Sequence, residues 1–290
     1  SSINRGLGVP VSEAAPRLTL EGYCVSVLAM VLTFLGTGTS FGVPRLGCSC
    51  RVCTSSDPRD FRTRSSIFIE GERGECLLVD AGPEFRLQAL KAGINKLDAV
   101  FITHAHADHV HGLDDVRPYT REKPLPLYVS SEERGELLQK FDYVFRHRQQ
   151  GGGVPKLELH DMRDPVVIGG ITISALPVLH GDRPILGYRF NNLAYITDCS
   201  EIPPATLELC RGIEVLIVDG LRQRPHPTHF TIDEALTAAR LIGSKQCFLT
   251  HLCHDFLHTE LESYCDSLGL LFKARSEEHT SELQSPNTIS

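Results

Sequence analysis

A surplus of positive charge is absent from this chain of 290 residues. Acidic residues outnumber basic ones, 36 to 29, and the formal net charge is −7. A general nucleic-acid binder needs a lysine and arginine surplus to neutralise phosphates, so this charge argues against that class of protein. It does not exclude a small anionic substrate held by metal ions. Membrane spans, internal repeats and low-complexity tracts are also absent between residues 30 and 274, and we expect a cytoplasmic protein.

Methionine is scarce, because Met30 and Met162 are the only two in the chain. Met30 stands directly before the apolar run 31–35, which predicts the first strand. We therefore predict that Met30 is the natural start and that residues 1–29 are a non-native or disordered extension. A signal peptide is the alternative, but no cationic segment precedes its apolar core as such a peptide requires.

The other end of the chain also lacks a fold signal. Residues 275–290 are polar, show no periodicity and resemble the translation of a common sequencing adapter. We predict an artefactual or disordered tail, with a flexible native tail as the alternative. Residues 30–274 then form one α/β domain, which is long enough to bury roughly three quarters of its unfolded surface.

The densest chemical pattern is the H-A-H-A-D-H motif at residues 104–109, which follows an apolar run that predicts a buried strand. Because alternate residues of an extended chain project to one side, His104 and His106 can bind one ion. Asp108 and His109, beyond the turn, can face another. Imidazole and carboxylate donors favour zinc, manganese or iron over calcium. The alternative is a histidine-rich loop that binds no metal.

Three of the ten cysteines, Cys48, Cys50 and Cys53, lie within six residues. In an intracellular chain this crowding is typical of metal ligation rather than of disulfides. Three thiolates at this spacing can occupy three corners of a tetrahedral zinc site, and the fourth ligand must come from elsewhere. Three unligated thiols in a loop are the alternative, but they would be liable to oxidation. The metal interpretation is therefore favoured.

Three polar residues follow apolar runs that predict strands. Asp80 can orient a metal ligand or the 104–109 loop, or it can merely stabilise a bend. His180 and Asp198 are expected at strand ends, where their side chains can enter a site from the same sheet edge as the histidine motif. Alone, each would be unremarkable. Their order along the chain, after the motif, makes both of them candidate metal ligands.

The last third of the chain adds two more histidines to the candidates. His251 follows the predicted core strand 246–250. His229 lies just before a helix predicted from 231 to 241 and closely follows Pro225 and Pro227, which restrict the backbone. A rigidly held histidine at a helix start is well placed to donate a proton.

Two further segments are expected near the site. The glycine-rich stretch 36–44 lacks the ending of a phosphate-binding P-loop, and we expect a tight turn close to the site, with substrate contact as the alternative. Residues 141–153 combine aromatic and cationic side chains with three glycines, which suits a flap over a pocket. A surface loop around a packed aromatic cluster is an equally good interpretation.

Taken in order, these candidates resemble the five motifs of the metallo-β-lactamase superfamily, over roughly residues 30–273. The resemblance implies an α/β fold of the four-layer αββα sandwich type, with a dinuclear site on its sheet edges. It also implies a division of the ligands: His104, His106 and His180 for one ion, Asp108, His109 and His251 for the other, and Asp198 bridging them.

A narrower resemblance is to the PhnP-type phosphoribosyl cyclic phosphodiesterases. They share the G-V-P-x-x-G-C-x-C-x-x-C opening found at residues 42–53 and the H-x-x-H ending found at His251 and His254. In that branch the second histidine joins the cysteines, so His254 would complete a structural zinc site with Cys48, Cys50 and Cys53. His229 aligns with the catalytic histidine of the family. The chain departs from the pattern at 141–153 and 222–224, which leaves the nucleotide or sugar preference open.

These resemblances imply a metal-dependent hydrolase that cleaves a small phosphodiester, with a cyclic one favoured. Two Zn²⁺ or Mn²⁺ ions would supply a bridging hydroxide for in-line attack, and His229 would protonate the departing alkoxide. Asp108 and Asp80 complete the predicted catalytic set. A tRNase Z-like nuclease is one alternative, although the basic arm of such enzymes has no counterpart here. A non-catalytic metal-binding domain is another. The native metal and the number of subunits, a homodimer included, are left open.

Overall fold

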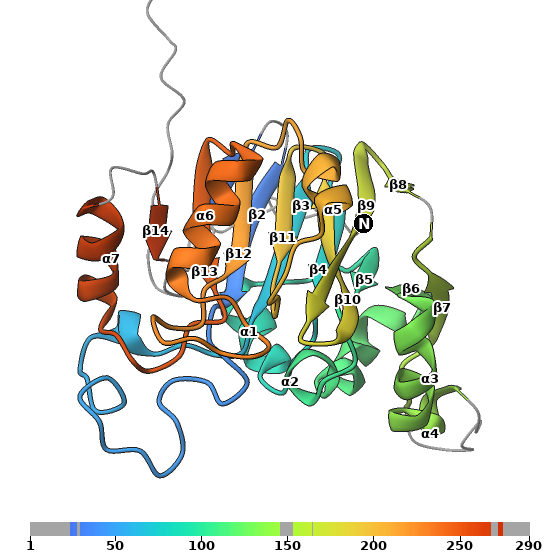
Figure 1. Ribbon diagram of the computed structural model, residues 1–290. Helices are drawn as coiled ribbons and strands as arrows, with labels where there is room; N and C mark the ends of the chain where they lie inside the picture. The colour runs from blue at the N-terminus through green and yellow to red at the C-terminus, as the bar shows by residue number, and fades with distance from the viewer. Residues whose placement is uncertain (1–23, 28–29, 146–152, 164, 268–271, 275–290) are drawn as a thin grey trace, which may run out of the picture.

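Two seven-stranded sheets face each other in the computed structural model, and helices cover their outer sides (Figure 1). The structure describes residues 24–27, 30–145, 153–163, 165–267 and 272–274. Among these residues, no helix is long and apolar enough to cross a membrane. Each sheet orders its strands as they follow in the chain, β1-β2-β3-β4-β5-β6-β7 in the first and β14-β13-β12-β11-β10-β9-β8 in the second.

The first sheet comprises β1 (Cys24–Val27), β2 (Met30–Gly36), β3 (Ser66–Gly71), β4 (Cys76–Val79), β5 (Ala99–Phe101), β6 (Leu125–Val129) and β7 (Leu157–Asp161). The second comprises β8 (Val166–Ile168), β9 (Ile171–His180), β10 (Arg183–Phe190), β11 (Leu193–Ile196), β12 (Val215–Asp219), β13 (Gln246–Thr250) and β14 (Phe272–Ala274). The helices that accompany the first sheet are α1 (Phe85–Ala92), α2 (Ala107–Val110), the 3₁₀ helix η2 (Leu113–Thr120), α3 (Ser131–Lys140) and α4 (Asp142–Phe145). Those of the second are α5 (Pro204–Leu209), α6 (Ile232–Ile242) and α7 (His258–Ser267), and a short 3₁₀ helix η1 (Pro58–Asp60) lies in the loop before β3.

Three hydrophobic clusters separate four layers. One lies between the sheets and joins residues such as Phe101 of the first sheet and Tyr188 of the second. A second cluster packs the outer face of the first sheet against α1, η2 and α3. The third packs the second sheet against α5, α6 and α7. The predicted αββα sandwich is therefore confirmed.

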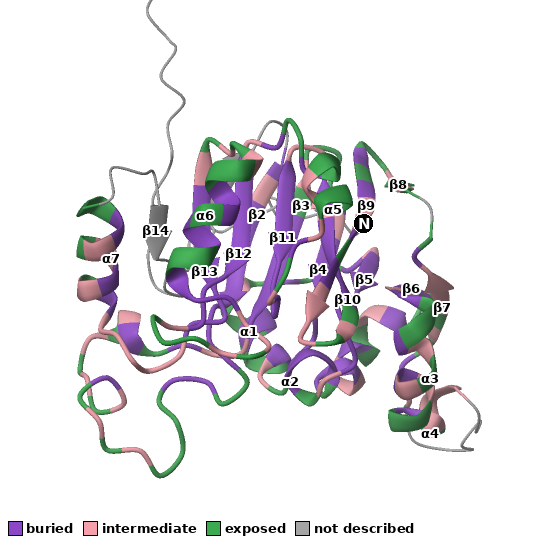
Figure 2. Cartoon of the chain, viewed as in Figure 1, coloured by how far each residue is buried: buried purple, intermediate pink, exposed green. Residues whose placement is uncertain are grey.

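Alternation of side chains explains why the central strands are apolar along their whole length. In β12, Val215 and Ile217 enter the cluster between the sheets, whereas Leu216 and Val218 enter the cluster beneath the helices. Both faces of such a strand are covered, so successive side chains are buried on opposite sides. Figure 2 shows this burial along the inner strands of both sheets.

Parallel pairing brings the carboxyl ends of several strands to one edge of each sheet. β4, β5 and β6 are parallel neighbours in the first sheet, as are β11, β12 and β13 in the second. Loops that leave parallel strands at their carboxyl ends meet there, which is where α/β proteins place their sites. Asp80, the 104–109 motif, Asp198 and His251 follow these ends, and His180 is the last residue of β9.

Some elements differ from the sequence-based prediction. The helix expected at 110–117 is instead α2, which begins at Ala107, followed by η2 after a break at Gly112. The strand expected at 171–176 continues to His180 as β9. The elements α5, α7, β8 and β14 were not predicted.

The ends of the chain bear on the predicted domain limits. Within the predicted N-terminal extension, 1–29, the structure describes the strand β1, which pairs antiparallel with β2. The other residues of that extension and the predicted tail, 275–290, lie outside the described residues. The limits of the natural domain therefore stay a prediction.

Candidate active site

The histidine motif forms the loop between β5 and α2. His104 and His109 are fully buried, and Asp108 is nearly so. The Nε2 atom of His104 lies 2.9 Å from Nδ1 of His106, so one ring nitrogen from each side chain is close enough for both to bind the same ion. Asp108 and His109 lie within α2, on the other side of the turn. The structure thus separates the motif into two pairs, as the sequence predicts.

Asp80 anchors this loop from the end of β4. Its carboxylate accepts hydrogen bonds from the backbone N–H and the hydroxyl of Thr103, both at 2.9 Å, and lies 2.7 Å from Nδ1 of His109. With Nδ1 held, the Nε2 atom of His109 is turned toward Asp108 and Asp198. Asp80 therefore orients a candidate ligand and the loop together, which is the first of the two roles considered for it.

Two glycines let the loop approach the Asp80 turn closely. A Cβ atom on Gly82 would lie 2.2 Å from the carbonyl oxygen of Asp108, and one on Gly112 would lie 2.0 Å from the carbonyl oxygen of Gly82. Neither contact is possible for a larger residue. The backbone instead joins Ala81 N to His109 O at 2.8 Å.

The second sheet supplies the remaining candidates. His180 ends β9, Asp198 follows β11 by two residues, and His251 follows β13 directly. Asp198 and His251 have positive φ, 54° and 58°, as Asp80 does at 61°. Left-handed backbone is strained for residues other than glycine and collects at functional sites, where surrounding contacts impose it.

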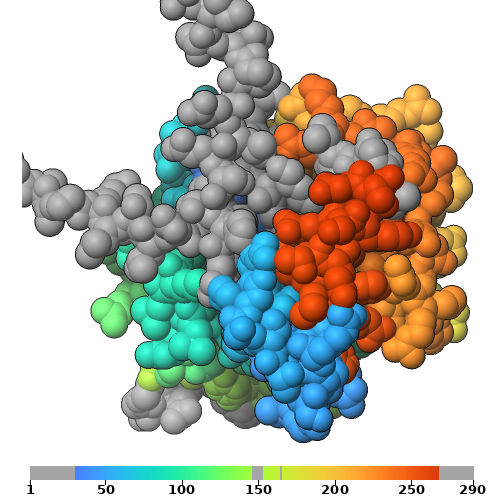
Figure 3. All heavy atoms as spheres, turned by 90° about the vertical axis from the view of Figure 1, so that its left-hand side faces the viewer, coloured from blue at the N-terminus to red at the C-terminus, as the bar shows by residue number. Residues whose placement is uncertain are grey.

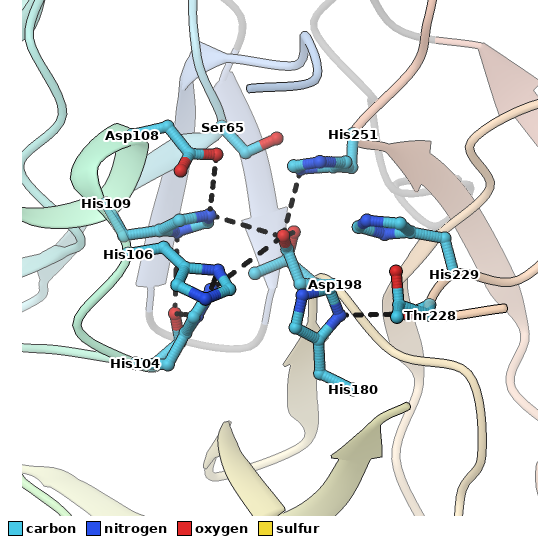
Figure 4. A network of polar contacts seen from close by, with 12 residues as sticks. Ser65, His104, His106, Asp108, His109, His180, Asp198, Thr228, His229 and His251 are labelled. Carbon is cyan, nitrogen blue, oxygen red and sulfur yellow. Dashed lines mark hydrogen bonds and ion pairs between the residues drawn. The ribbon is translucent and has the colours of Figure 1, made fainter. Parts of the chain in front are cut away.

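Asp198 occupies the centre of the cluster (Figure 4). One of its oxygens lies 2.9 Å from Nδ1 of His251 and 3.3 Å from Nε2 of His109, while the other lies 3.9 Å from Nε2 of His104. Among the described residues of this cluster, candidate donor atoms that lie within 4.8 Å of one another form three groups: His104, His106 and His180; Asp108, His109, Asp198 and His251; and His180, Asp198 and His229. All seven ligands predicted for the two active-site ions thus meet in one place, and Asp198 lies between the two sets.

The protonation of these groups follows their surroundings. Burial lowers the pKa values of His104, His106 and His180, which keeps these rings neutral with a lone pair free to bind a cation. Burial also acts on His109 and His251, but the nearby carboxylates, Asp198 above all, raise the pKa values of both rings. The same pairing, acting against burial, keeps the pKa values of Asp108 and Asp198 below their usual range. The buried carboxylates of Asp108 and Asp198 are therefore stabilised by positive charge beside them.

These residues fit two divalent cations. His109 Nε2 and His251 Nδ1 are buried without a well-formed hydrogen bond, although each faces a carboxylate at ion-pair distance. Imidazole nitrogens and carboxylate oxygens are the donors that zinc and manganese accept. A cation between the rings and the carboxylates would satisfy both at once.

His229 stands beside the cluster and is held by a residue that sequence analysis missed. Its Nδ1 atom lies 2.8 Å from Oδ2 of Asp219, which is fully buried at the end of β12 and also accepts the N–H of Cys199 at 2.9 Å. Burial and then the neighbouring His251 lower the pKa of His229 to about 4. The sequence pattern could have identified Asp219 as a candidate, because it ends a buried apolar strand just as Asp80 follows one.

Backbone contacts orient two other rings. Nδ1 of His180 lies 2.9 Å from the carbonyl oxygen of Thr228, so its Nε2 atom can face the cluster. In the glycine-rich loop, the Thr39 hydroxyl lies 3.2 Å from Nε2 of His251. The predicted approach of this loop to the site is therefore observed.

The three cysteines form a separate cluster with His254. The Sγ atoms of Cys48, Cys50 and Cys53 lie 3.4, 3.3 and 3.4 Å from Nδ1 of His254. The backbone N–H of Cys53 helps to lower the pKa of the Cys50 thiol to about 6, whereas burial raises that of Cys53 to about 11. Four donors at mutual contact fit a closed tetrahedral zinc site. Figure 3 shows this loop region packed against α7, where Arg51 pairs with Glu260.

The segments expected to set specificity are partly described. Arg222 donates to the carbonyl oxygens of Arg224 and Pro225 and so holds its own loop. Arg224 pairs with Asp255 at 3.0 Å and joins this loop to the one after β13. Of the predicted flap, Phe141 is buried and begins the turn into α4, but residues 146–152 lie outside the described residues.

Comparison with known proteins places this geometry in a family. The model of the Beta-lactamase superfamily domain matches residues 76–252. A crystal structure described as a new diphosphatase from the PhnP family is 39% identical, with a TM-score of 0.79, over 87% of this chain and 96% of that one. Human tRNase Z, short form, shares the fold at 19% identity, with a TM-score of 0.61, over 86% of this chain and 97% of that one.

Two curated relatives carry other names. An octanoyltransferase of Porphyromonas gingivalis (strain ATCC BAA-308 / W83) is 38% identical over 84% of this chain, which spans only 55% of that protein's length. A ribonuclease Z of Mycobacterium sp. (strain KMS) is 26% identical over 68% of this chain and 81% of its own length. From the matched domain, the shared fold and the similarity to the PhnP-family structure, we conclude that the chain belongs to the metallo-β-lactamase superfamily, in its PhnP family.

Proposed function

We propose that this protein is a metal-dependent hydrolase that cleaves a small phosphodiester, a cyclic one in the first instance. The observation that carries the proposal is the placement of Asp198 between two sets of donors, with His229 beside them. Two sets of donors that share one carboxylate would suit a pair of cations, as in two-metal phosphoester hydrolases. The chain's family membership agrees with a hydrolase.

The residues divide into two proposed metal sites and a proton donor. The first metal would be held by His104, His106 and His180, the second by Asp108, His109 and His251, and Asp198 would be shared. When bound, the cations would activate a water as nucleophile and offset negative charge that develops on the phosphoryl oxygens. Asp80 contributes by holding His109 in the orientation that faces the second site.

His229 is proposed to protonate the leaving oxygen. Asp219 fixes the ring through Nδ1, which leaves Nε2 as the atom that can exchange a proton with substrate. The ring is neutral at pH 7 before substrate binds, since its pKa is about 4. An anionic phosphoryl group beside the ring favours its protonated form, so substrate binding prepares it to act as an acid.

A diphosphate linkage is the second candidate. The PhnP-family structure that is 39% identical to this chain is described as a diphosphatase. Both reactions displace an oxygen from phosphorus and place the same demand on the metal sites. They differ in the leaving group, because a phosphate needs less protonation than a sugar alkoxide does.

The two candidates are separated by assaying protein loaded with Zn²⁺ or Mn²⁺ against matched substrates. We would compare a 2′,3′-cyclic nucleotide, a dinucleotide diphosphate and bis(p-nitrophenyl) phosphate, which has a leaving group that needs little protonation. We expect His229→Ala to slow hydrolysis of the cyclic diester by about two to four powers of ten, the scale of general acid catalysis. The p-nitrophenyl ester should be affected much less.

His226→Ala is the matched control, since His226 lies on the same loop with its ring centroid 5.0 Å from that of His229. The control should keep wild-type rates on all three substrates. If His229→Ala slows hydrolysis of the cyclic nucleotide and of bis(p-nitrophenyl) phosphate equally, His229 does not act as the acid. Metal-loaded protein that turns over none of the substrates would support the non-catalytic alternative. Cleavage of a precursor tRNA but of no small diester would support the tRNase Z-like one.

A further inference from the structure

The backbone N–H and the backbone carbonyl of one residue in the histidine motif are both held by a single helix. The backbone N–H of Ala105, which lies between His104 and His106, donates to Oε2 of Glu133 at 2.6 Å. The carbonyl oxygen of the same residue accepts from Lys140. Glu133 and Lys140 both come from α3, and the Glu133 side chain is almost completely buried. The position of the two histidines is therefore coupled to this helix.

The same carboxylate is held from the second sheet. Arg183, the first residue of β10, donates from Nε to Oε1 of Glu133 at 2.7 Å and from Nη2 to Oε2 at 2.5 Å. It also donates to Glu136 at 2.5 Å. A two-point contact of this kind fixes the angle as well as the distance between guanidinium and carboxylate.

Arg183 is tied in turn to another candidate ligand. In the hairpin of β9 and β10, it is the direct partner of His180. Its Nη1 atom also lies 3.2 Å from Nε2 of His106. One side-chain pair thus connects the loop of the first sheet that carries two ligands with the hairpin of the second sheet that carries the third.

We propose that the Glu133–Arg183 pair is a clamp across the two sheets that sets the geometry of the first metal site. Glu133 and Arg183 are positioning residues, because they act through the ligands and not on substrate. Two other hydrogen bonds join the sheets nearby. Leu186 N donates to Thr103 O at 3.1 Å, and the Tyr188 hydroxyl donates to Ile102 O at 2.6 Å, so both reach residues that come before His104. The clamp is the contact at the ligand-bearing turn itself.

The second metal site does not depend on this pair. Its donors are Asp108 and His109 from α2, and Asp198 and His251 from the second sheet. Asp80 holds His109 and Thr39 contacts His251, and neither touches α3 or Arg183 in the contacts of the described residues. Loss of the clamp should therefore weaken the binding of one cation and leave the affinity for the other unchanged. A general loss of stability would not produce this difference.

The test measures metal release and does not require turnover. Wild-type and variant proteins, each loaded with Zn²⁺, are titrated with a chelator, and the metal that remains is counted by mass spectrometry. We expect Glu133→Gln to lose one equivalent at a chelator concentration about 10–100-fold below that needed for the wild type, the usual effect of removing a partner of a metal ligand. The remaining equivalents should leave at wild-type concentrations.

Arg183→Gln removes the other half of the clamp from a less buried position and should release the same single equivalent early. If Glu133→Gln fails to fold, this variant decides the question alone. The matched control is Glu132→Gln, an exposed neighbour on α3 whose carboxylate accepts a hydrogen bond from the Ser131 hydroxyl at the start of the helix. The double variant should lose less affinity than the two single changes added together, because both single changes break the Glu133–Arg183 contact.

Two results would overturn the clamp. Release of every equivalent at the wild-type concentration would show that neither residue positions a ligand. A change in KM for Arg183→Gln without any change in metal release would assign the arginine to substrate instead. Because the inference rests on the proposed metal sites, wild-type protein that binds no metal there would end both. Wild-type protein that binds metal without turnover would refute only the proposed function.

Discussion

The histidine–aspartate cluster and the cysteine–histidine cluster are built differently. The first is assembled from strand ends of both sheets, and its central carboxylate, Asp198, is almost fully buried. The second joins a loop at Cys48–Cys53 to His254, and its thiols are only half-buried. The first combines charged and neutral donors in two sets, whereas the second offers four donors to a single centre.

We propose that this difference separates a reactive site from a structural one. Four protein donors close a tetrahedral zinc site and leave no position for substrate. Two incomplete sets that share Asp198 can leave positions open, and His229 stands beside them. The predictions below test whether chemistry depends on one region and stability on the other.

The largest effect is expected from Asp198→Ala. This change removes the carboxylate shared by both proposed metal sites, and we expect turnover to fall by at least about three powers of ten, because metal assistance supplies several kcal/mol of catalysis. Metal analysis should show that the equivalent bound by the cysteine cluster is retained. A variant with more than a tenth of wild-type turnover would contradict the shared role of Asp198.

A smaller effect on turnover is expected from Asp219→Asn. The change keeps the shape of the residue but weakens its hold on Nδ1 of His229, and we expect turnover to fall by roughly one to two powers of ten, as for other partners of functional histidines. Metal content should be unchanged. The contrasting variant is Asp80→Asn, which acts on His109 and should weaken metal binding. Equal metal content in both variants would remove the distinction between the two carboxylates.

The cysteine cluster should govern stability rather than chemistry. Cys50→Ser removes one donor, and we expect the Tm to fall by about 10 °C, since a structural metal supplies several kcal/mol and each kcal/mol shifts the Tm of such a domain by about 2–4 °C. The kcat of protein that remains folded should change little. Cys76→Ser is the control, because Cys76 lies in β4 outside the cluster, and a similar fall in Tm there would contradict the assignment.

The smallest expected effect concerns His258, at the start of α7 beside the cysteine cluster. Burial and then the charge of Arg62 lower the pKa of His258 to about 4. The contacts agree, because Nδ1 lies 3.1 Å from Arg62 Nη2 and so accepts a hydrogen bond. The unfolded state, with a pKa of about 6.5, binds this proton more tightly than the folded state does. Stability should therefore fall as the pH drops from about 6.5 toward 4.

Denaturant unfolding at pH 7.5 and 5.5 measures this effect. Between these values the free energy of unfolding of the wild type should fall by roughly 1–1.5 kcal/mol more than that of His258→Gln, which cannot bind the proton. His160→Gln, at a partly exposed histidine of β7, should keep the wild-type response. An identical pH dependence for the wild type and His258→Gln would refute the assignment of a neutral, buried ring.

Sequence analysis succeeded where apolar runs end in polar residues. The apolar runs predict strands at 125–129, 215–219 and 246–250, and β6, β12 and β13 have these bounds. The capping box of α6, in which Thr231 and Glu234 bond reciprocally, was equally visible. The candidate ligands all follow such elements, so their convergence could be predicted.

The failures have physical reasons too. The strand predicted at 171–176 stops before Pro177, which lacks a ladder donor, yet the pairing of β9 with β10 continues past that proline. The helix α7 buries only His258, Leu261 and Cys265 and has no clear apolar stripe. Glu133 and Arg183 carry no local motif, and only the tertiary structure brings their side chains together.

The most direct test of the account is anomalous X-ray diffraction from crystals of protein purified without added metal and then loaded with Zn²⁺. The account predicts two peaks that share Asp198, one within bonding distance of His104, His106 and His180 and one within that of Asp108, His109 and His251. A third peak should lie among the cysteines. Peaks at the cysteines alone, with none beside Asp198, would contradict the proposed metal-dependent site.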